Sequence, residues 1–177
     1  MNVRRFCKGH VLDIGCGPGD IFNRYFLNGN GQSVDFHDYE GLKASQVIKD
    51  PKKFPFTDAS FDTVTLIANI NHIPKSVFED EIKEIGRVLK KDGELVMTRI
   101  GLVISFLTHN WVKVQSAVSK EYYDMDSDRG MEEDERYTVS FEEIESACKK
   151  AGLTYQGTHK IWTQWALNEI LIFKKVQ

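Results

Sequence analysis

Apolar residues along the chain follow two alternating patterns. Residues 11–14 form a short apolar run with β-branched members, which is typical of a buried parallel strand. The glycines within residues 15–19 interrupt this run. Apolar side chains at helical spacing then follow in residues 21–26. The pattern predicts a strand, a glycine turn and a helix.

The same two patterns recur through the rest of the chain. Residues 77–89 carry apolar side chains at helical spacing, and Ser140 with Glu143 forms a capping box that predicts a helix from Phe141 to Gly152. The last two predicted strands are separated by a short link, so we expect them to be antiparallel. In all, seven strands are predicted, at residues 11–14, 33–37, 45–49, 61–68, 94–100, 153–161 and 166–174.

The turn after the first strand is the stretch with the clearest chemistry. It lies in residues 10–20, which read H-V-L-D-I-G-C-G-P-G-D. Alternate glycines let a ligand approach the main chain closely, and the N-terminus of the following helix favours a carboxylate or phosphate. The dinucleotide fingerprint G-x-G-x-x-G is absent, because its third glycine would fall at Asp20 or Phe22. Asp13 instead lies on the strand, two residues before the first glycine.

The run V-L-D-I-G-C-G-P-G resembles motif I of the class I S-adenosylmethionine-dependent methyltransferases, and the chain is similar to their small type 11 or UbiE-like members. Two further stretches carry the resemblance: K-D-P-K-K-F-P-F-T-D-A-S-F-D and E-I-G-R-V-L-K-K-D-G-E-L-V-M-T. The similarity extends over nearly the whole chain and is strongest over residues 11–98. It implies a Rossmann-like three-layer α/β sandwich, with a seven-stranded, mostly parallel sheet whose last strand is antiparallel.

The resemblance also implies a site for S-adenosyl-L-methionine, with S-adenosyl-L-homocysteine as the product. An acid on the first strand and the glycine loop would hold the methionine end. Acids after the second and third strands would hold the ribose and the adenine, and an asparagine after the fourth strand would border the pocket floor. The residues at these places are Asp13, Gly15, Cys16, Gly17, Gly19, Asp38, Asp50 and Asn69.

Two of these assignments have alternatives or departures. Asp35 and Glu40 compete with Asp38 for the ribose, and the register of the second strand decides among them. Pro51 lacks the backbone N–H that the family often offers to the adenine ring. The segment of residues 39–50 is also short, with room for little more than the third strand.

Candidates for the chemical step are His72, as a base near neutral pH or as a residue that holds a loop, and Tyr122. Tyr122 belongs to an insertion at about residues 101–139, which we expect to form the acceptor site or a lid. Apolar residues at helical spacing predict a helix at 104–122 within it. Residues 124–135 resemble a calcium loop with its required glycine displaced by one position, so no metal site is predicted.

Composition limits the classes of function further. A chain of 177 residues with a net charge of −3 fits a single domain over residues 1–177, and its charge argues against a nucleic-acid partner. Three cysteines without a metal-binding spacing favour a reduced, cytoplasmic setting. Neither a signal peptide nor a membrane-spanning run is recognisable, so no membrane partner is expected.

We therefore expect a methyltransferase that uses S-adenosyl-L-methionine and methylates a small-molecule acceptor. Because the sulfonium methyl is already activated, a dry pocket and correct placement supply most of the catalysis, and a dedicated base is not obligatory. Two alternatives stay open. One is a protein or RNA acceptor, and the other is a binding module that keeps the fold without catalysis, which Pro51 and the short segment before it favour.

Overall fold

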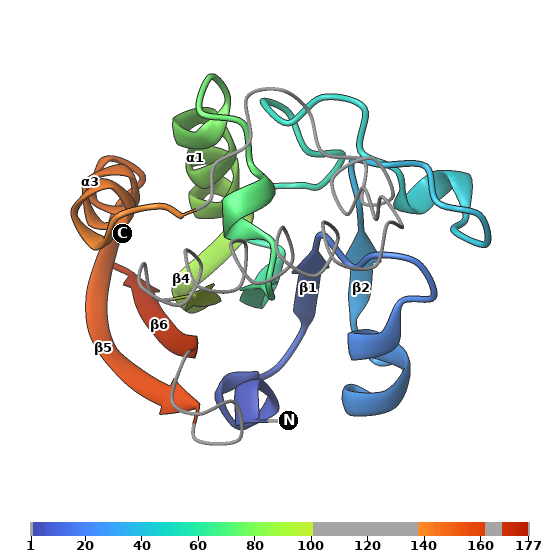
Figure 1. The fold of residues 1–177 in the computed structure, drawn as a ribbon, viewed down its shortest axis with the longest axis horizontal. Helices are drawn as coiled ribbons and strands as arrows, with labels where there is room; N and C mark the ends of the chain where they lie inside the picture. The colour runs from blue at the N-terminus through green and yellow to red at the C-terminus, as the bar shows by residue number, and fades with distance from the viewer. Residues whose placement is uncertain (1, 101–137, 162–167, 177) are drawn as a thin grey trace, which may run out of the picture.

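The computed structural model describes residues 2–100, 138–161 and 168–176. These residues form a six-stranded sheet in the order β2-β1-β3-β4-β6-β5 (Figure 1). The predicted helix at 104–122, which includes Tyr122, and the acidic stretch 124–135 lie outside the described residues. The strands are β1 (Val11–Ile14), β2 (Gln32–Val34), β3 (Phe61–Leu66), β4 (Leu89–Ile100), β5 (Leu153–Ile161) and β6 (Asn168–Lys175).

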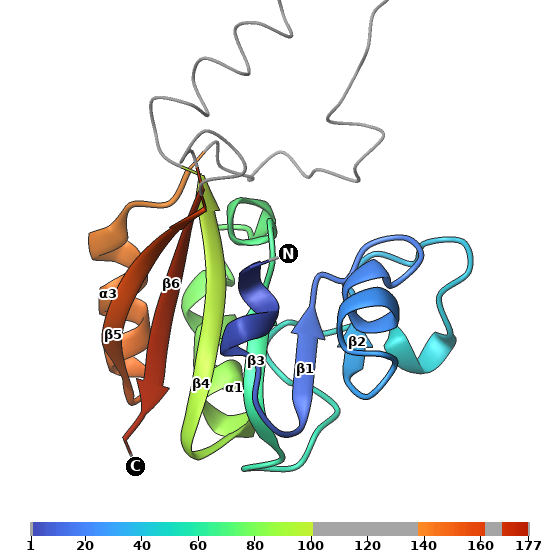
Figure 2. The ribbon, with the colours of Figure 1, turned by 90° about the horizontal axis from the view of Figure 1, so that it is seen from below.

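The strand directions agree with the prediction. β1 pairs in parallel with β2 and β3, β3 pairs in parallel with β4, and β6 is antiparallel to both β4 and β5 (Figure 2). The antiparallel final strand is therefore confirmed. Because parallel strands end at the same edge of a sheet, the loops that follow β1, β2 and β3 meet there.

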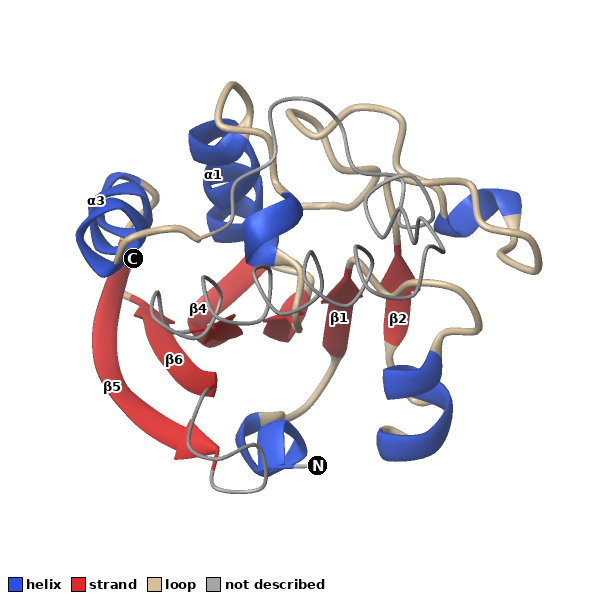
Figure 3. Cartoon of the chain, in the orientation of Figure 1, coloured by secondary structure: helices blue, strands red, loops and turns tan. Residues whose placement is uncertain are grey.

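Helices cover both faces of this sheet (Figure 3). α1 (Phe78–Val88) and α3 (Phe141–Lys150) lie on one face. The short helical turns η1 (Asn2–Phe6) and η2 (Phe22–Phe26) lie on the other. This arrangement confirms the three-layer α/β class. None of the helices in the described chain has the length and apolar character needed to cross a bilayer.

Each face of the sheet has its own core. The larger core lies under α1 and α3 and buries the largest side chains, including Phe61, Phe78 and Phe173. The smaller core lies under η1 and η2, where Val3 and Phe22 pack on side chains of β4 and β6. A helix of five residues buries little surface alone, so these two turns depend on this apolar patch for their place.

The ends of α3 follow the predicted signals. Ser140 Oγ accepts a hydrogen bond from the backbone N–H of Glu143 at 3.2 Å, as expected at a helix start. The helix ends before Gly152, which adopts φ +76°. α1 approaches this end closely, because a Cβ added at Gly86 would lie 2.6 Å from the carbonyl oxygen of Ala151. A glycine is needed in α1 at that contact.

The sheet has six strands in the described residues rather than the predicted seven. The predicted third strand at 45–49 starts inside a helical turn, η3 (Ala44–Gln46), and then makes only a single parallel bridge with the end of β2. Gln46 explains the difference. Its side chain accepts a hydrogen bond from Lys43 N at 3.2 Å and donates one to Ser33 O at 3.3 Å, so it closes its own turn against β2.

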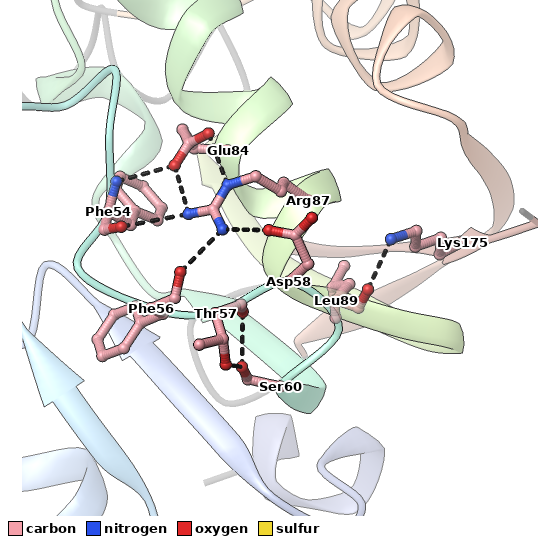
Figure 4. A network of polar contacts seen from close by, with 9 residues as sticks. All are labelled: Phe54, Phe56, Thr57, Asp58, Ser60, Glu84, Arg87, Leu89 and Lys175. Atoms are coloured by element: carbon pink, nitrogen blue, oxygen red, sulfur yellow. Dashed lines mark hydrogen bonds and ion pairs between the residues drawn. The ribbon is translucent and has the colours of Figure 1, made fainter.

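One side chain of α1 holds the irregular segment that precedes β3 (Figure 4). The Arg87 guanidinium donates to the carbonyl oxygens of Phe54 at 3.2 Å and Phe56 at 2.8 Å. It also pairs with the carboxylates of Glu84 and Asp58, both at 2.7 Å. Glu84 in turn accepts the backbone N–H of Phe54 at 2.8 Å. The Arg87–Glu84 pair thus supplies partners that a regular ladder would otherwise provide.

We predict that Arg87→Gln lowers the free energy of unfolding by about 2 kcal/mol, because it leaves the half-buried Glu84 and two backbone carbonyls without their donor. Urea unfolding of the variant and the wild type measures this loss. Lys150→Gln is the matched control, since it breaks an exposed ion pair with Glu79 and should cost about 0.5 kcal/mol or less. Equal losses in the two variants would contradict the special role of Arg87.

Candidate cofactor site

The glycine loop after β1 adopts a backbone that only glycine takes easily. Gly15, Gly17 and Gly19 have φ of +74°, +63° and +86°. A Cβ added at Gly15 would clash with the side chain of Asn69, which follows β3. A Cβ added at Gly17 would meet no atom within 4 Å. The loop therefore packs against Asn69 at its start and leaves open space over Gly17.

Hydrogen bonds attach this loop to the end of β2. The N–H groups of Gly15 and Cys16 both donate to the carbonyl oxygen of Val34, at 2.9 and 3.1 Å. The N–H of Gly17 donates to Asp35 Oδ2 at 2.8 Å, and the other oxygen of Asp35 accepts the N–H of His37 at 2.9 Å. Asp35 is thus placed beside the loop as part of its support.

Asp13 lies on β1, two residues before the loop begins. It is 2 % exposed, and its Oδ1 accepts a hydrogen bond of 2.6 Å from Thr65, its register partner on β3. Burial raises the pKa of Asp13 to about 7; the Thr65 hydrogen bond opposes this shift, and Asp20 and Asp35 add to it. Burial likewise raises the pKa of the Cys16 thiol to about 12, so Cys16 stays protonated at neutral pH and is no nucleophile.

The other predicted site residues lie on the neighbouring loops. Asp38 and Asp50 are exposed, on the segments after β2 and η3, and Asp50 Oδ1 accepts the N–H of Lys52 at 2.9 Å. His72 ends the helical turn η4 (Ile70–His72), and its N–H donates to Asn69 O at 2.9 Å. In the residues that the structure describes, no three His, Cys, Asp or Glu side chains are grouped as a metal site would need.

Two buried acids were not anticipated from the sequence. Asp20, at the end of the loop, is 7 % exposed with φ +51°, and its Oδ1 has no hydrogen-bond partner. Glu81 on α1 is 1 % exposed, and burial raises its pKa to about 8, with a further contribution from Asp35. The signal for Glu81 was present, because it lies between Phe78 and Ile82 on the apolar stripe of the predicted helix.

These features fit a ligand with a cationic amino-acid end. The open space over Gly17 admits a ligand against the backbone. The unpartnered oxygen of Asp20 and the buried carboxyl of Asp13 favour a positively charged group nearby. The residues present at the loop therefore suit S-adenosyl-L-methionine, which carries a sulfonium and an ammonium group.

We predict that the ligand-free protein becomes less stable as pH rises from 6 to 8. Asp13 and Glu81 have folded-state pKa values raised to about 7 and 8 from 3.8 and 4.5, so the folded state binds more protons than the unfolded state in this window. Glu81→Gln should flatten this dependence and raise Tm at pH 8 by about 5 °C. Thermal unfolding across the pH range measures both effects.

Glu142→Gln, which changes an exposed carboxyl on α3, is the control and should leave the pH profile as in the wild type. A wild-type Tm that rises between pH 6 and pH 8 would refute the assignment of raised pKa values to the two buried acids.

The sequence relatives found by comparison with known proteins are methyltransferases. A family model described as a methyltransferase domain matches residues 12–97. Demethylmenaquinone methyltransferase of Lactobacillus johnsonii is 31% identical over 102 residues, covering 48% of this chain and 41% of the relative. The ubiquinone/menaquinone biosynthesis C-methyltransferase UbiE of Rickettsia felis is 25% identical over 138 residues, covering 66% and 50%. The chain thus spans about half the length of these curated relatives.

Solved structures share the fold. An S-adenosylmethionine-dependent methyltransferase of Methanosarcina mazei has a TM-score of 0.67 at 18% identity, covering 99% of this chain and 98% of that one. The 1,6-didemethyltoxoflavin-N1-methyltransferase of Burkholderia thailandensis, with bound 1,6-didemethyltoxoflavin and S-adenosylhomocysteine, has a TM-score of 0.61 at 14% identity, covering 98% and 73%. The matched part of the chain, residues 12–97, is a methyltransferase domain. This match, the sequence relatives and the shared fold support a class I S-adenosylmethionine-dependent methyltransferase.

Proposed function

We propose that this chain transfers a methyl group from S-adenosyl-L-methionine to a small-molecule acceptor. The observation that carries the proposal is the open glycine loop beside the buried Asp13, braced by the hydrogen bond between Gly17 N and Asp35. A loop of that shape presents its backbone to a ligand, and the neighbouring carboxyls suit the cationic end of the cofactor.

Different residues around the loop would bind different parts of the cofactor. Asp13 and the glycine loop would hold the methionine end, and Asn69 would border the floor of the pocket, against Gly15. Asp38, or its neighbour Glu40, would accept hydrogen bonds from the ribose hydroxyls, since carboxylates are acceptors. Asp50 would accept a hydrogen bond from the adenine amino group.

The bound cofactor supplies a methyl group activated by a positively charged sulfur. The chain contributes by holding the acceptor in line with that methyl and by excluding water, so that placement provides most of the rate enhancement. His72 would be the candidate to accept a proton, and its backbone N–H bond to the carbonyl of Asn69, which packs against Gly15, supports this role. An acceptor that is already nucleophilic needs no such base.

Small-molecule acceptors are favoured by the names of the relatives. The curated relatives are named as a demethylmenaquinone methyltransferase and a ubiquinone/menaquinone biosynthesis C-methyltransferase, and the Burkholderia thailandensis enzyme holds 1,6-didemethyltoxoflavin. The net charge of −3 supports this choice, because binding to nucleic acid is dominated by cationic contacts to phosphates. A protein acceptor, or a module without catalysis, is the reading that remains if no small molecule is methylated.

We predict that the wild type binds S-adenosyl-L-homocysteine with a Kd in the micromolar range and that Gly17→Arg lowers the affinity about 100-fold, because the arginine fills the open space over the loop. Calorimetric titration measures both values. Gly29→Arg is the matched control, since Gly29 also has positive φ, +72°, and no atom within 4 Å of an added Cβ. A folded wild type that does not bind the ligand would refute the proposed function.

We further predict that Asp38→Asn weakens S-adenosyl-L-homocysteine binding about tenfold without lowering Tm, because Asp38 is exposed and its loss removes a ribose acceptor. Asp35→Asn should lower both affinity and Tm, since the two oxygens of Asp35 accept the N–H groups of Gly17 and His37. If Glu40→Gln costs more affinity than Asp38→Asn, Glu40 is the ribose acceptor.

A further inference from the structure

Among the Asp, Glu, Lys, Arg and His residues that the structure describes, only four acids are buried. These are Asp13, Asp20, Asp35 and Glu81, which are 2 %, 7 %, 8 % and 1 % exposed. We call them the carboxyl cluster. None of them forms an ion pair with a Lys, Arg or His of residues 2–100, 138–161 or 168–176, whereas eight exposed or half-buried acids there do.

Three members of the cluster come from different elements that meet at the glycine loop. Asp13 is on β1, Asp20 ends the loop, and Asp35 follows β2 and accepts the N–H of Gly17 at 2.8 Å. The fourth member, Glu81, is on α1. Their charges act on one another, because Asp20 and Asp35 both raise the pKa of Asp13, and Asp35 raises that of Glu81.

The hydrogen bonds of the cluster satisfy it only in part. Asp13 accepts from Thr65, Asp35 from two backbone N–H groups, and Asp20 Oδ2 from Asn23 Nδ2 at 3.3 Å. The other oxygen of Asp20 and Oε1 of Glu81 are buried and have no hydrogen-bond partner. Neutral donors lower the cost of a buried carboxylate, but they bring no counter-charge. The site thus has an unbalanced negative charge that a cationic ligand would relieve.

The two states of the proposed cofactor differ in this charge. When an acceptor lone pair takes the methyl group, the S–C bond breaks and its electron pair stays on the sulfur, which becomes neutral. The proton that the acceptor loses goes to solvent or to a base. Before transfer the sulfur is therefore positive, and after transfer it is an uncharged thioether.

We propose that the carboxyl cluster makes this site select its ligand by charge, so that it binds the sulfonium cofactor more tightly than the neutral thioether product, with Asp20 supplying an unpaired oxygen at the end of the glycine loop. The proposal rests on the function proposed above and goes beyond it, because it assigns a specificity role to Asp20 and Asp35. Its consequence is that the product leaves readily and inhibits weakly.

The test compares two stable ligands that differ at this one centre. Sinefungin carries a protonated amine where the cofactor has its sulfonium, and S-adenosyl-L-homocysteine has a neutral sulfur there. At pH 8, calorimetry on the wild type should give a Kd for sinefungin about tenfold below that for S-adenosyl-L-homocysteine. Asp20→Asn should reduce this ratio about fivefold by weakening sinefungin, while Glu142→Gln, at an exposed position on α3, leaves it unchanged.

The ratio separates selection by charge from a merely structural role. A variant with a damaged pocket weakens both ligands alike and leaves the ratio as it was. A second readout needs no variant. The wild-type ratio should fall between pH 8 and pH 6, because Asp13, which faces Thr65, Asp20, Asp35 and the Cys7 thiol, becomes protonated there.

The outcomes are distinguishable. If neither ligand binds the folded wild type, the proposed function fails. If both bind with a ratio near one at pH 8, or if the ratio is the same in Asp20→Asn as in the wild type and at pH 6 as at pH 8, selection by charge is overturned while cofactor binding stands. Retention of a tenfold ratio in 0.5 M salt would support the buried cluster as its source, because buried charges are screened little.

Discussion

The hydrogen bonds between the glycine loop and the end of β2 are the constraint on which the site depends. Val34 O accepts two loop N–H groups, and Asp35 accepts a third. A loop of three glycines would otherwise sample many conformations, at a large entropic cost on binding a ligand. Because β1 pairs with β2 on one side and β3 on the other, the strands that place Asp13 also place the residues that hold the loop. Fold and site are therefore stabilised by the same contacts.

The sheet could be predicted because its signals are local and repeated. Apolar runs of the right length marked β1, β3 and both strands of the final hairpin, and the capping box at Ser140 marked α3. The predicted third strand at 45–49 does not form a regular strand, and the pattern of apolar residues does not show why. Gln46 uses its side chain to close a turn against β2, and a side-chain hydrogen bond of that kind competes with a ladder only in the folded geometry.

Some residues of the site could likewise be predicted from the sequence, and others could not. Asp13 and the glycines were recognisable because spacing alone distinguishes them from a dinucleotide fingerprint. In the sequence, Asp20 stood out only because it occupies the place of the third glycine in the dinucleotide fingerprint. Its burial depends on the turn into η2. Asp35, Asp38 and Glu40 are close in sequence, and no pattern shows which of them the backbone turns inward. The structure turns Asp35 toward the loop and leaves Asp38 exposed.

A protein gains nothing in stability from four buried carboxyls without a cation, since each must be desolvated or kept protonated. Elsewhere in the described chain acids form ion pairs with basic side chains: Glu84 with Arg87, Asp62 with Lys90, and Glu169 with Arg99. Because the unpaired carboxyl cluster and these ion-paired acids occur in the same molecule, the lack of counter-charges in the cluster does not reflect a general shortage of basic residues. Destabilising charge that gathers mainly around one loop, as Asp13, Asp20 and Asp35 do here, is the pattern expected where function and stability make opposite demands. The Arg87 network on α1, which braces the segment before β3, contributes stability where β3 begins, at the opposite edge of the sheet from the glycine loop.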